Sequence, residues 1–211
     1  MCYTASRFGI SFDVMTIQVH DTTCRNCGAA AEVGQTTCKY CKQPVVISTF
    51  NSVYAMPMPM INQYAATYRE ALQNEPCASD LNNSIAFCYL KLKLHDKALA
   101  AFEKAIESNF DHPETYFYAA ICLLKGKKAF LAQRPVIDKI ETYINAALMI
   151  EPRGIFYYFW AYIKYDYFER KSLNTTPNYQ ELLRQSKTAG FSPLDTEQLF
   201  GILGVVRPDV F

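Results

Sequence analysis

The chain has 211 residues, of which 50% are hydrophobic and 14% aromatic, so a packed core is possible and global disorder is excluded. Its 21 basic and 20 acidic residues give a formal net charge of +1, which argues against a large polyanion-binding face and a nucleic-acid binder. No stretch approaches the roughly eighteen consecutive apolar residues that a membrane span needs.

Residues 1–19 are predicted to be an N-terminal extension. Up to His20 this segment carries one basic residue, Arg7, and no small-residue cleavage site follows, so it does not match a secretory signal. Met15 as the natural start is an alternative that the sequence leaves open.

Residues 20–50 contain two Cys-x-x-Cys pairs separated by ten residues. Two residues between ligands let one tight turn present both sulfurs to the same ion, and four thiolates in a tetrahedron suit Zn²⁺. A redox dithiol and a loose loop are the alternatives, but no βαβ pattern surrounds either pair. The sequence therefore predicts a Zn²⁺ site formed by Cys24, Cys27, Cys38 and Cys41.

Gly28 is expected to have the positive φ that the first turn needs, Gly34 and Gln35 to form the tip of the connecting loop, and residues 45–47 to form a short strand. This unit resembles the zinc-ribbon family. The resemblance implies a small β-hairpin, a structural metal and use as a docking element. With four cysteine ligands no position stays open for a water molecule, which disfavours metal catalysis.

Three basic residues, Arg25, Lys39 and Lys42, lie beside the cysteine pairs and are expected to offset the charge of the thiolates. Contact with nucleic acid is the alternative role, although so few charges provide little affinity. The remaining cysteines occur singly, at positions 2, 77, 88 and 122. Such spacing does not fit a set of disulfides and indicates a reducing, cytoplasmic environment.

Residues 51–60 include Met-Pro-Met-Pro-Met and are predicted to form an extended linker, because proline disfavours a helix interior. From Ile61 onward the apolar residues recur with a helical period. The clearest helices are predicted over residues 81–94, 97–108 and 113–125. A good helix start at Ser192-Pro-Leu-Asp195 predicts a last helix that ends near Gly204 and caps the others.

Small and aromatic residues recur along this helical part. Ala86 and Cys88 return as Ala120 and Cys122, thirty-four residues later. A second series of alanines recurs with spacings of 34, 42 and 42 residues: Ala71, Ala105, Ala147 and Ala189. The residues three positions before them are larger in most cases: Tyr68, Phe102, Ile144 and Ser186. A 34-residue helix–turn–helix period with small residues at helix crossings is typical of tetratricopeptide repeats.

Residues 61–211 therefore resemble the tetratricopeptide repeat (TPR) family. The best match runs from Asp80 to Ser108, while the later units carry about eight extra residues between their helices, over 125–134 and 170–177. The resulting fold class is mostly α: a TPR-like solenoid of helical hairpins preceded by a small β-hairpin zinc ribbon.

The resemblance implies that a partner peptide or helix binds in a groove lined by the first helix of each repeat. By the repeat register the groove residues are Asn83, Phe87, Phe117, Ile121, Phe159 and Ile163. Their apolar character favours an amphipathic helix or an apolar peptide. The alternative is that these side chains belong to the core. The chain's own tail, residues 205–211, could also fold back into the groove.

Aromatic residues surround every side of residues 156–165, so either both sides of this helix are covered or one side binds a partner.

Catalytic motifs are missing from the sequence. The three histidines, His20, His95 and His112, suit turns or helix starts, and neither a phosphate-binding glycine loop nor a Gly-x-Ser-x-Gly motif occurs. We expect a non-enzymatic scaffold that binds a protein partner. The alternatives are a nucleic-acid-associated adaptor that uses the ribbon and a structural subunit of a larger assembly. The oligomeric state stays open.

Overall fold

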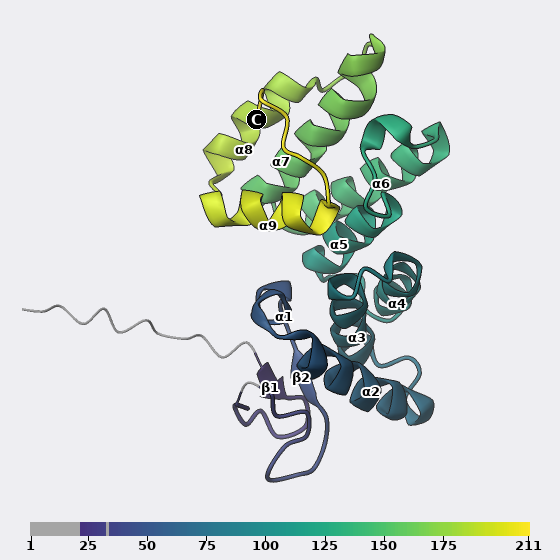
Figure 1. Cartoon of the computed structure of the whole chain (residues 1–211), viewed down its shortest axis with the longest axis vertical. Coiled ribbons are helices and arrows are strands. Elements are labelled where there is room, and N and C mark those ends of the chain that lie inside the picture. Colours follow the sequence, from purple (N-terminus) through teal and green to yellow (C-terminus); the bar gives the residue numbers. More distant parts are fainter. Residues whose placement is uncertain (1–21, 33) are drawn as a thin grey trace, which may run out of the picture.

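A computed structural model of the chain describes residues 22–32 and 34–211, and this part of the protein is mostly helical (Figure 1). Two short strands lie near its N-terminal end. The extension predicted over residues 1–19, the alternative start at Met15 and the environment of His20 lie outside the described residues.

The strands β1, Thr22–Cys24, and β2, Val45–Ile47, pair antiparallel, with Thr23 opposite Val46. In β2 the first and last side chains are buried and the middle one is partly exposed, as in a strand with one face on a core. The strand predicted at residues 45–47 is confirmed.

Helices make up most of the remaining chain. They are α1 (Phe50–Ala55), α2 (Met58–Asn74), α3 (Ser79–Lys91), α4 (His95–Ser108), α5 (Pro113–Leu123), α6 (Arg134–Ile150), α7 (Gly154–Ile163), α8 (Tyr179–Ala189) and α9 (Pro193–Leu203). A π-helical segment, Lys164–Phe168, continues α7, and short 3₁₀ turns occupy Ala129–Leu131 and Glu169–Lys171.

The Met-Pro segment is largely helical, so the prediction of an extended linker over residues 51–60 is wrong. Helix α1 begins at Phe50, and α2 begins at Met58 with Pro57 as its N-cap and Pro59 in its first turn. Proline fits there because the first N–H groups of a helix have no intrahelical acceptor. The prolines therefore mark the start of α2.

The other helix predictions agree with the structure. The three helices expected over 81–94, 97–108 and 113–125 are α3, α4 and α5, with ends that differ by at most three residues. The expected last helix is α9. Ser192 and Asp195 form a reciprocal capping box at its start, and Gly204 ends it with a φ of 65°.

From α2 to α8 the helices stack along the long axis of the molecule (Figure 1). Neighbours in sequence pack side by side. The recurring positions are buried in successive helices: Tyr68, Phe102, Ile144 and Ser186 are all fully buried, as are Ala86 and Ala120. Positions that repeat in the sequence are thus equivalent packing positions, which is the physical basis of a repeat.

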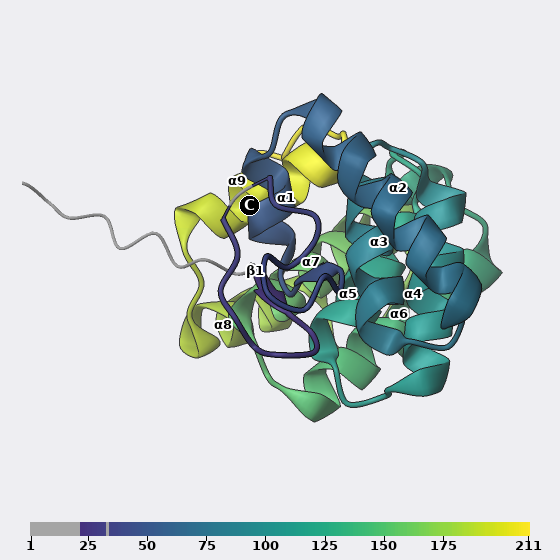
Figure 2. The same cartoon turned by 90° about the horizontal axis from the view of Figure 1, so that it is seen from below.

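Helices α3, α5 and α7 share one side of the stack, which we call the inner face, and other segments of the chain cover much of it. The ring of Phe50 in α1 lies 6.1 Å from Phe87 and 5.1 Å from Tyr118. At the other end, Phe200 of α9 lies 5.5 Å from Tyr162 of α7. Figures 1 and 2 both place α1 beside α9.

Helix α7 and its continuation contain the aromatic residues 156–165 and are covered on both sides. Of the two alternatives for these residues, coverage on both sides therefore describes the structure, rather than one side left open for a partner. Phe156, Phe159 and Tyr162 are buried. On the inner side the tail folds back, and the ring of Phe211 lies 5.4 Å from Tyr158.

None of the helices in the described residues is long and apolar enough to cross a membrane.

Candidate metal centre and inner-face pocket

The two cysteine pairs sit on turns of the same geometry. In each turn the N–H of the first cysteine donates to the carbonyl five residues later, Ala29 for Cys24 and Gln43 for Cys38. The fifth residue of each turn has a positive φ, 68° at Gly28 and 61° at Lys42. The prediction for Gly28 is confirmed. The second turn adopts the same conformation without a glycine, which the sequence did not reveal.

All four sulfurs gather at one point, as predicted for the quartet. The Sγ atoms of Cys24, Cys27, Cys38 and Cys41 lie within 4.8 Å of one another. The shorter Sγ–Sγ distances are 3.2 Å between Cys24 and Cys41, 3.6 Å between Cys27 and Cys38, and 3.7 Å between Cys41 and Cys27. These values exceed the bond length of a disulfide, which is about 2.05 Å. A tetrahedral ion with bonds of about 2.3 Å needs sulfurs roughly 3.8 Å apart, so the cluster fits a metal ion.

Backbone N–H groups favour the thiolate form of the first cysteine in each pair. The pKa of Cys24 is lowered, chiefly by the N–H of Cys27, and the pKa of Cys38 is lowered by the N–H groups of Cys41 and Tyr40. The two turns therefore act on the sulfur of their first cysteine in the same way.

Two of the three basic residues near the cysteines pair with carboxylates, while the ammonium of the third, Lys42, donates to the carbonyl of Lys39 at 3.0 Å. Arg25 donates to Glu75 at 2.8 Å and to Asp80 at 2.9 Å, and Lys39 pairs with Glu32 at 2.6 Å. Their positive charges are thus shared with acidic side chains, so the expected role as counter-charges to the thiolates is reduced. Arg25 instead ties the first cysteine turn to the start of α3.

The cysteine unit packs directly on the helices. Ser84 of α3 accepts a hydrogen bond from the N–H of Ile47 at 3.0 Å and lies 3.2 Å from the carbonyl oxygen of the same residue. Tyr68 of α2 donates to the carbonyl of Val45 at 2.6 Å, and Tyr64 donates to that of Gln35 at 3.1 Å. Whether the cysteine unit packs on the helices was open from the sequence, and these contacts show that it does.

The predicted groove residues are all buried. Asn83, Phe87, Phe117, Ile121, Phe159 and Ile163 are each less than 7% exposed. Asn83 accepts a hydrogen bond from Thr115 at 2.9 Å. The expectation that these six side chains line an open groove is corrected, because α1, α9, the tail and neighbouring helices cover them. The alternative, that they belong to the core, describes the structure.

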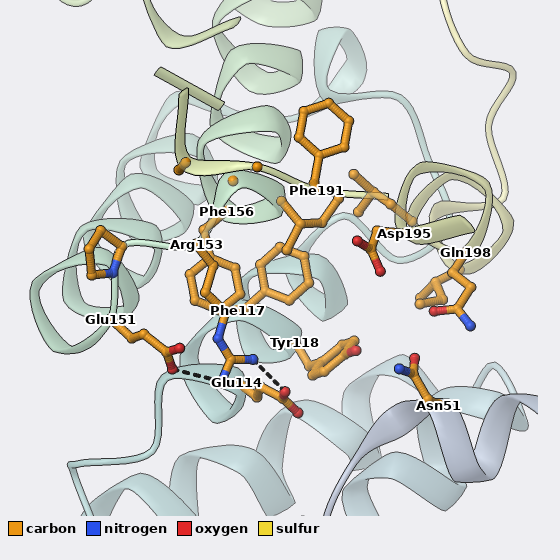
Figure 3. A pocket seen from close by; sticks show the side chains of 17 residues that line it. Asn51, Glu114, Phe117, Tyr118, Glu151, Arg153, Phe156, Phe191, Asp195 and Gln198 are labelled. Atoms are coloured by element: carbon orange, nitrogen blue, oxygen red, sulfur yellow. Dashed lines mark hydrogen bonds and ion pairs between the residues drawn. The ribbon is translucent and has the colours of Figure 1, made fainter. Parts of the chain in front are cut away.

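A polar cavity of about 370 Å³ remains on the inner face (Figure 3). It lies between α1, α5, the start of α7 and α9. Charged side chains around it include Glu114, Glu151, Arg153 and Asp195. Sequence reasoning missed this site, since its residues come from four separate segments that share no motif.

Two of the histidines lie in the described residues: His112 is at a helix start, as predicted, and His95, predicted to lie in a turn between helices, is the first residue of α4. His112 is the N-cap residue of α5, and its Nδ1 atom lies 3.0 Å from the hydroxyl of Thr115. His95 begins α4, and burial lowers its pKa. Its buried Nδ1 atom has no hydrogen-bond partner among the described residues.

Neither a protein-family model nor a curated protein sequence matches this chain.

Proposed function

We propose that this protein is a non-enzymatic interaction scaffold, in which a TPR-like helical solenoid carries a structural zinc ribbon. The observation that carries the proposal is the direct packing of a four-cysteine cluster on one end of a stack of helical hairpins. A unit of about thirty residues has too small a core to fold alone, and a metal supplies the missing stability. The stack supplies an extended surface, which is what repeat proteins use to bind other proteins.

Zinc is the metal that we propose for the cluster. Tetrahedral sites with four thiolates suit Zn²⁺ or iron, and four protein ligands leave no position for a reacting water molecule. Cys24, Cys27, Cys38 and Cys41 would hold the ion, which supplies a crosslink between the two turns. This arrangement favours a structural role.

The β-hairpin character of the ribbon and the repeat character of the helices belong to the same proposal. Strands β1 and β2 pair antiparallel on either side of the cysteine turns, as the two arms of a hairpin would. Buried residues recur through α2, α4, α6 and α8 as in tetratricopeptide units. The covered inner face differs from an open TPR groove, so binding would use the cavity that remains or the outer surface.

Native mass spectrometry with and without a chelator, together with elemental analysis, tests the metal assignment. One zinc ion per chain is the expected result. A chain purified without metal, or with iron in its place, would contradict it.

A pull-down from the protein's own cells, repeated after nuclease treatment, tests the scaffold. We expect a protein partner that survives the nuclease. A partner lost with the nuclease would instead support a nucleic-acid adaptor, for which the exposed Tyr40, between Lys39 and Cys41 at the second cysteine turn, is the favouring feature. Self-association of the purified chain alone would support a structural subunit of an assembly.

A further inference from the structure

The cavity on the inner face has a lining that suits a ligand. Acidic groups outnumber basic ones in its lining, which has three carboxylates and one cation, Arg153. The carboxylates are Glu114, Glu151 and Asp195. Rings of Phe117 and Phe156 lie behind them, 4.7 Å apart (Figure 3). A cavity with aromatic walls and a surplus of carboxylates complements a positively charged group.

Arg153 shows how this cavity holds a cation. Its guanidinium donates to Glu114 at 2.6 Å and to Glu151 at 2.7 Å, and it lies 5.6 Å from the ring centre of Phe156. One side of the cavity is thus already occupied by a cation between two carboxylates and over an aromatic ring. This internal example uses the same kinds of group, carboxylates and an aromatic ring, that a ligand would meet in the cavity.

Two carboxylates of the cavity keep oxygen atoms that Arg153 does not contact, although Glu114 pairs with Arg153 through its Oε1 atom. Glu114 Oε2 is buried and has no hydrogen-bond partner in the part of the chain that the structure describes. Asp195 points into the cavity (Figure 3), and its recorded side-chain partner is the N–H of Ser192. Buried carboxylate oxygens normally accept hydrogen bonds, so these two carboxylates have unused acceptor capacity.

Tyr118 reports the negative potential between these two carboxylates. Its pKa is raised, first by burial and then by the charges of Glu114 and Asp195. Both carboxylates therefore act on the same point of the cavity, although they come from α5 and α9.

Two amide side chains stand at the edge of the same region. Asn51 of α1 and Gln198 of α9 line the cavity, and neither side chain makes a hydrogen bond within the described residues. An amide offers both a donor and an acceptor, which matches the needs of an extended peptide backbone. The cavity thus combines sites for a charged side chain and for the main chain on either side of it.

We propose that this cavity binds a basic side chain, lysine or arginine, of a partner peptide. Glu114 and Asp195 would hold the cationic group, and Asn51 and Gln198 the flanking backbone. This inference rests on the proposed scaffold function and names the chemistry of its partner. It replaces the apolar ligand that the buried groove residues had suggested.

Isothermal titration calorimetry of the full chain with capped tetralysine and tetraarginine peptides tests the proposal. We expect one of them to bind, and the double variant Glu114→Gln/Asp195→Asn to weaken binding about tenfold or more, since each hydrogen bond to a charged group contributes about 1.5–3 kcal/mol. Glu107→Gln is the matched control, because it removes the same kind of charge from an exposed position on α4, away from the cavity. It should leave the affinity unchanged.

The proposal is overturned if acetylated tetralysine or tetraglutamate binds as well as the basic peptides, or if the control and the double variant weaken binding equally. Failure of both basic peptides to bind at millimolar concentration also overturns it. Asn51→Ala, on the exposed side of α1, is a second variant should the double variant fail to fold. If the wild type and both variants capture the same partner from lysate equally well, this inference fails and the scaffold function stands.

Discussion

Among the glycines of the described residues, Gly154 at the start of α7 has the least space for a side chain. A Cβ atom there would press against the carbonyl of Gly190 and lie 2.7 Å from that of Ser186, both at the end of α8. Backbone atoms cannot move aside as a flexible side chain can, so only glycine allows α7 and α8 to approach this closely.

Gly154→Ala should therefore destabilise the protein by about 1–3 kcal/mol, as measured by urea unfolding followed by circular dichroism. Gly201→Ala in α9 is the control, because its Cβ would meet the flexible end of Tyr54 at 3.1 Å. We expect little change in the free energy of unfolding for this control variant. Equal losses in both variants would show that the α7–α8 contact is not special.

Tyr68 of α2 is a second residue with a structural role, because one hydrogen bond from its side chain joins α2 to β2. Its hydroxyl donates to the carbonyl of Val45 at 2.6 Å, and both groups are buried. Tyr68→Phe keeps the ring but leaves that carbonyl without its donor, so we expect a loss of about 1–3 kcal/mol. Tyr64→Phe, which removes a partly exposed bond of 3.1 Å, should cost less in the same denaturation experiment. A larger loss of stability for Tyr64→Phe than for Tyr68→Phe would argue against the role of Tyr68 in holding β2.

At the scale of elements, α6 and α7 are joined by a buried ion pair. Lys164, in the π-helical segment, pairs with Glu141 of α6 at 2.6 Å, and its side chain is only 5% exposed. The same carboxylate oxygen accepts the indole N–H of Trp160 at 2.8 Å. The ammonium also lies 4.5 Å from the ring centre of Phe168, so the charge has several partners.

Lys164→Met should cost about 3–5 kcal/mol, because it leaves Glu141 with a nearly buried, unpaired charge. The double variant Lys164→Met/Glu141→Gln should recover part of this loss. Trp160 is the one tryptophan of the chain, so its fluorescence reports this contact during denaturation. Additive losses in the double variant would mean that the two side chains do not interact.

At the scale of the whole molecule, the cysteine unit and the helices are joined by several contacts. Arg25, Tyr64, Tyr68 and Ser84 connect the cysteine unit to α2 and α3. In a stack of repeats each unit contacts mainly its neighbours, so a disturbance at one end should fade along the stack.

Removal of the metal by a chelator should therefore raise amide hydrogen exchange in residues 22–55 and in α2, and leave α7 to α9 nearly unchanged. Hydrogen-exchange mass spectrometry measures this gradient directly. A uniform rise along the chain would indicate one cooperative unit. No rise at all would show that the cysteine cluster needs no metal.

Local signals predicted much of this architecture. Cysteine spacing predicted the quartet, because two residues between ligands already define a turn. Helical periodicity located α3, α4 and α5, and the Ser192–Asp195 cap located α9. The Met-Pro segment was mistaken for a linker, because proline at a helix start and proline in a linker look alike until the following helix is seen.

The sequence by itself determined the helices α3, α4, α5 and α9 and the meeting of the four thiols, since each of these depends on residues close together in the chain. Only the tertiary structure decided which face of the stack is covered. Phe87 and Phe117 are apolar whether they face a partner or the chain's own α1 and neighbouring helices, so their burial depends on segments far away in sequence. The cavity between Glu114, Arg153 and Asp195 arises for the same reason, because long-range packing brings its walls together.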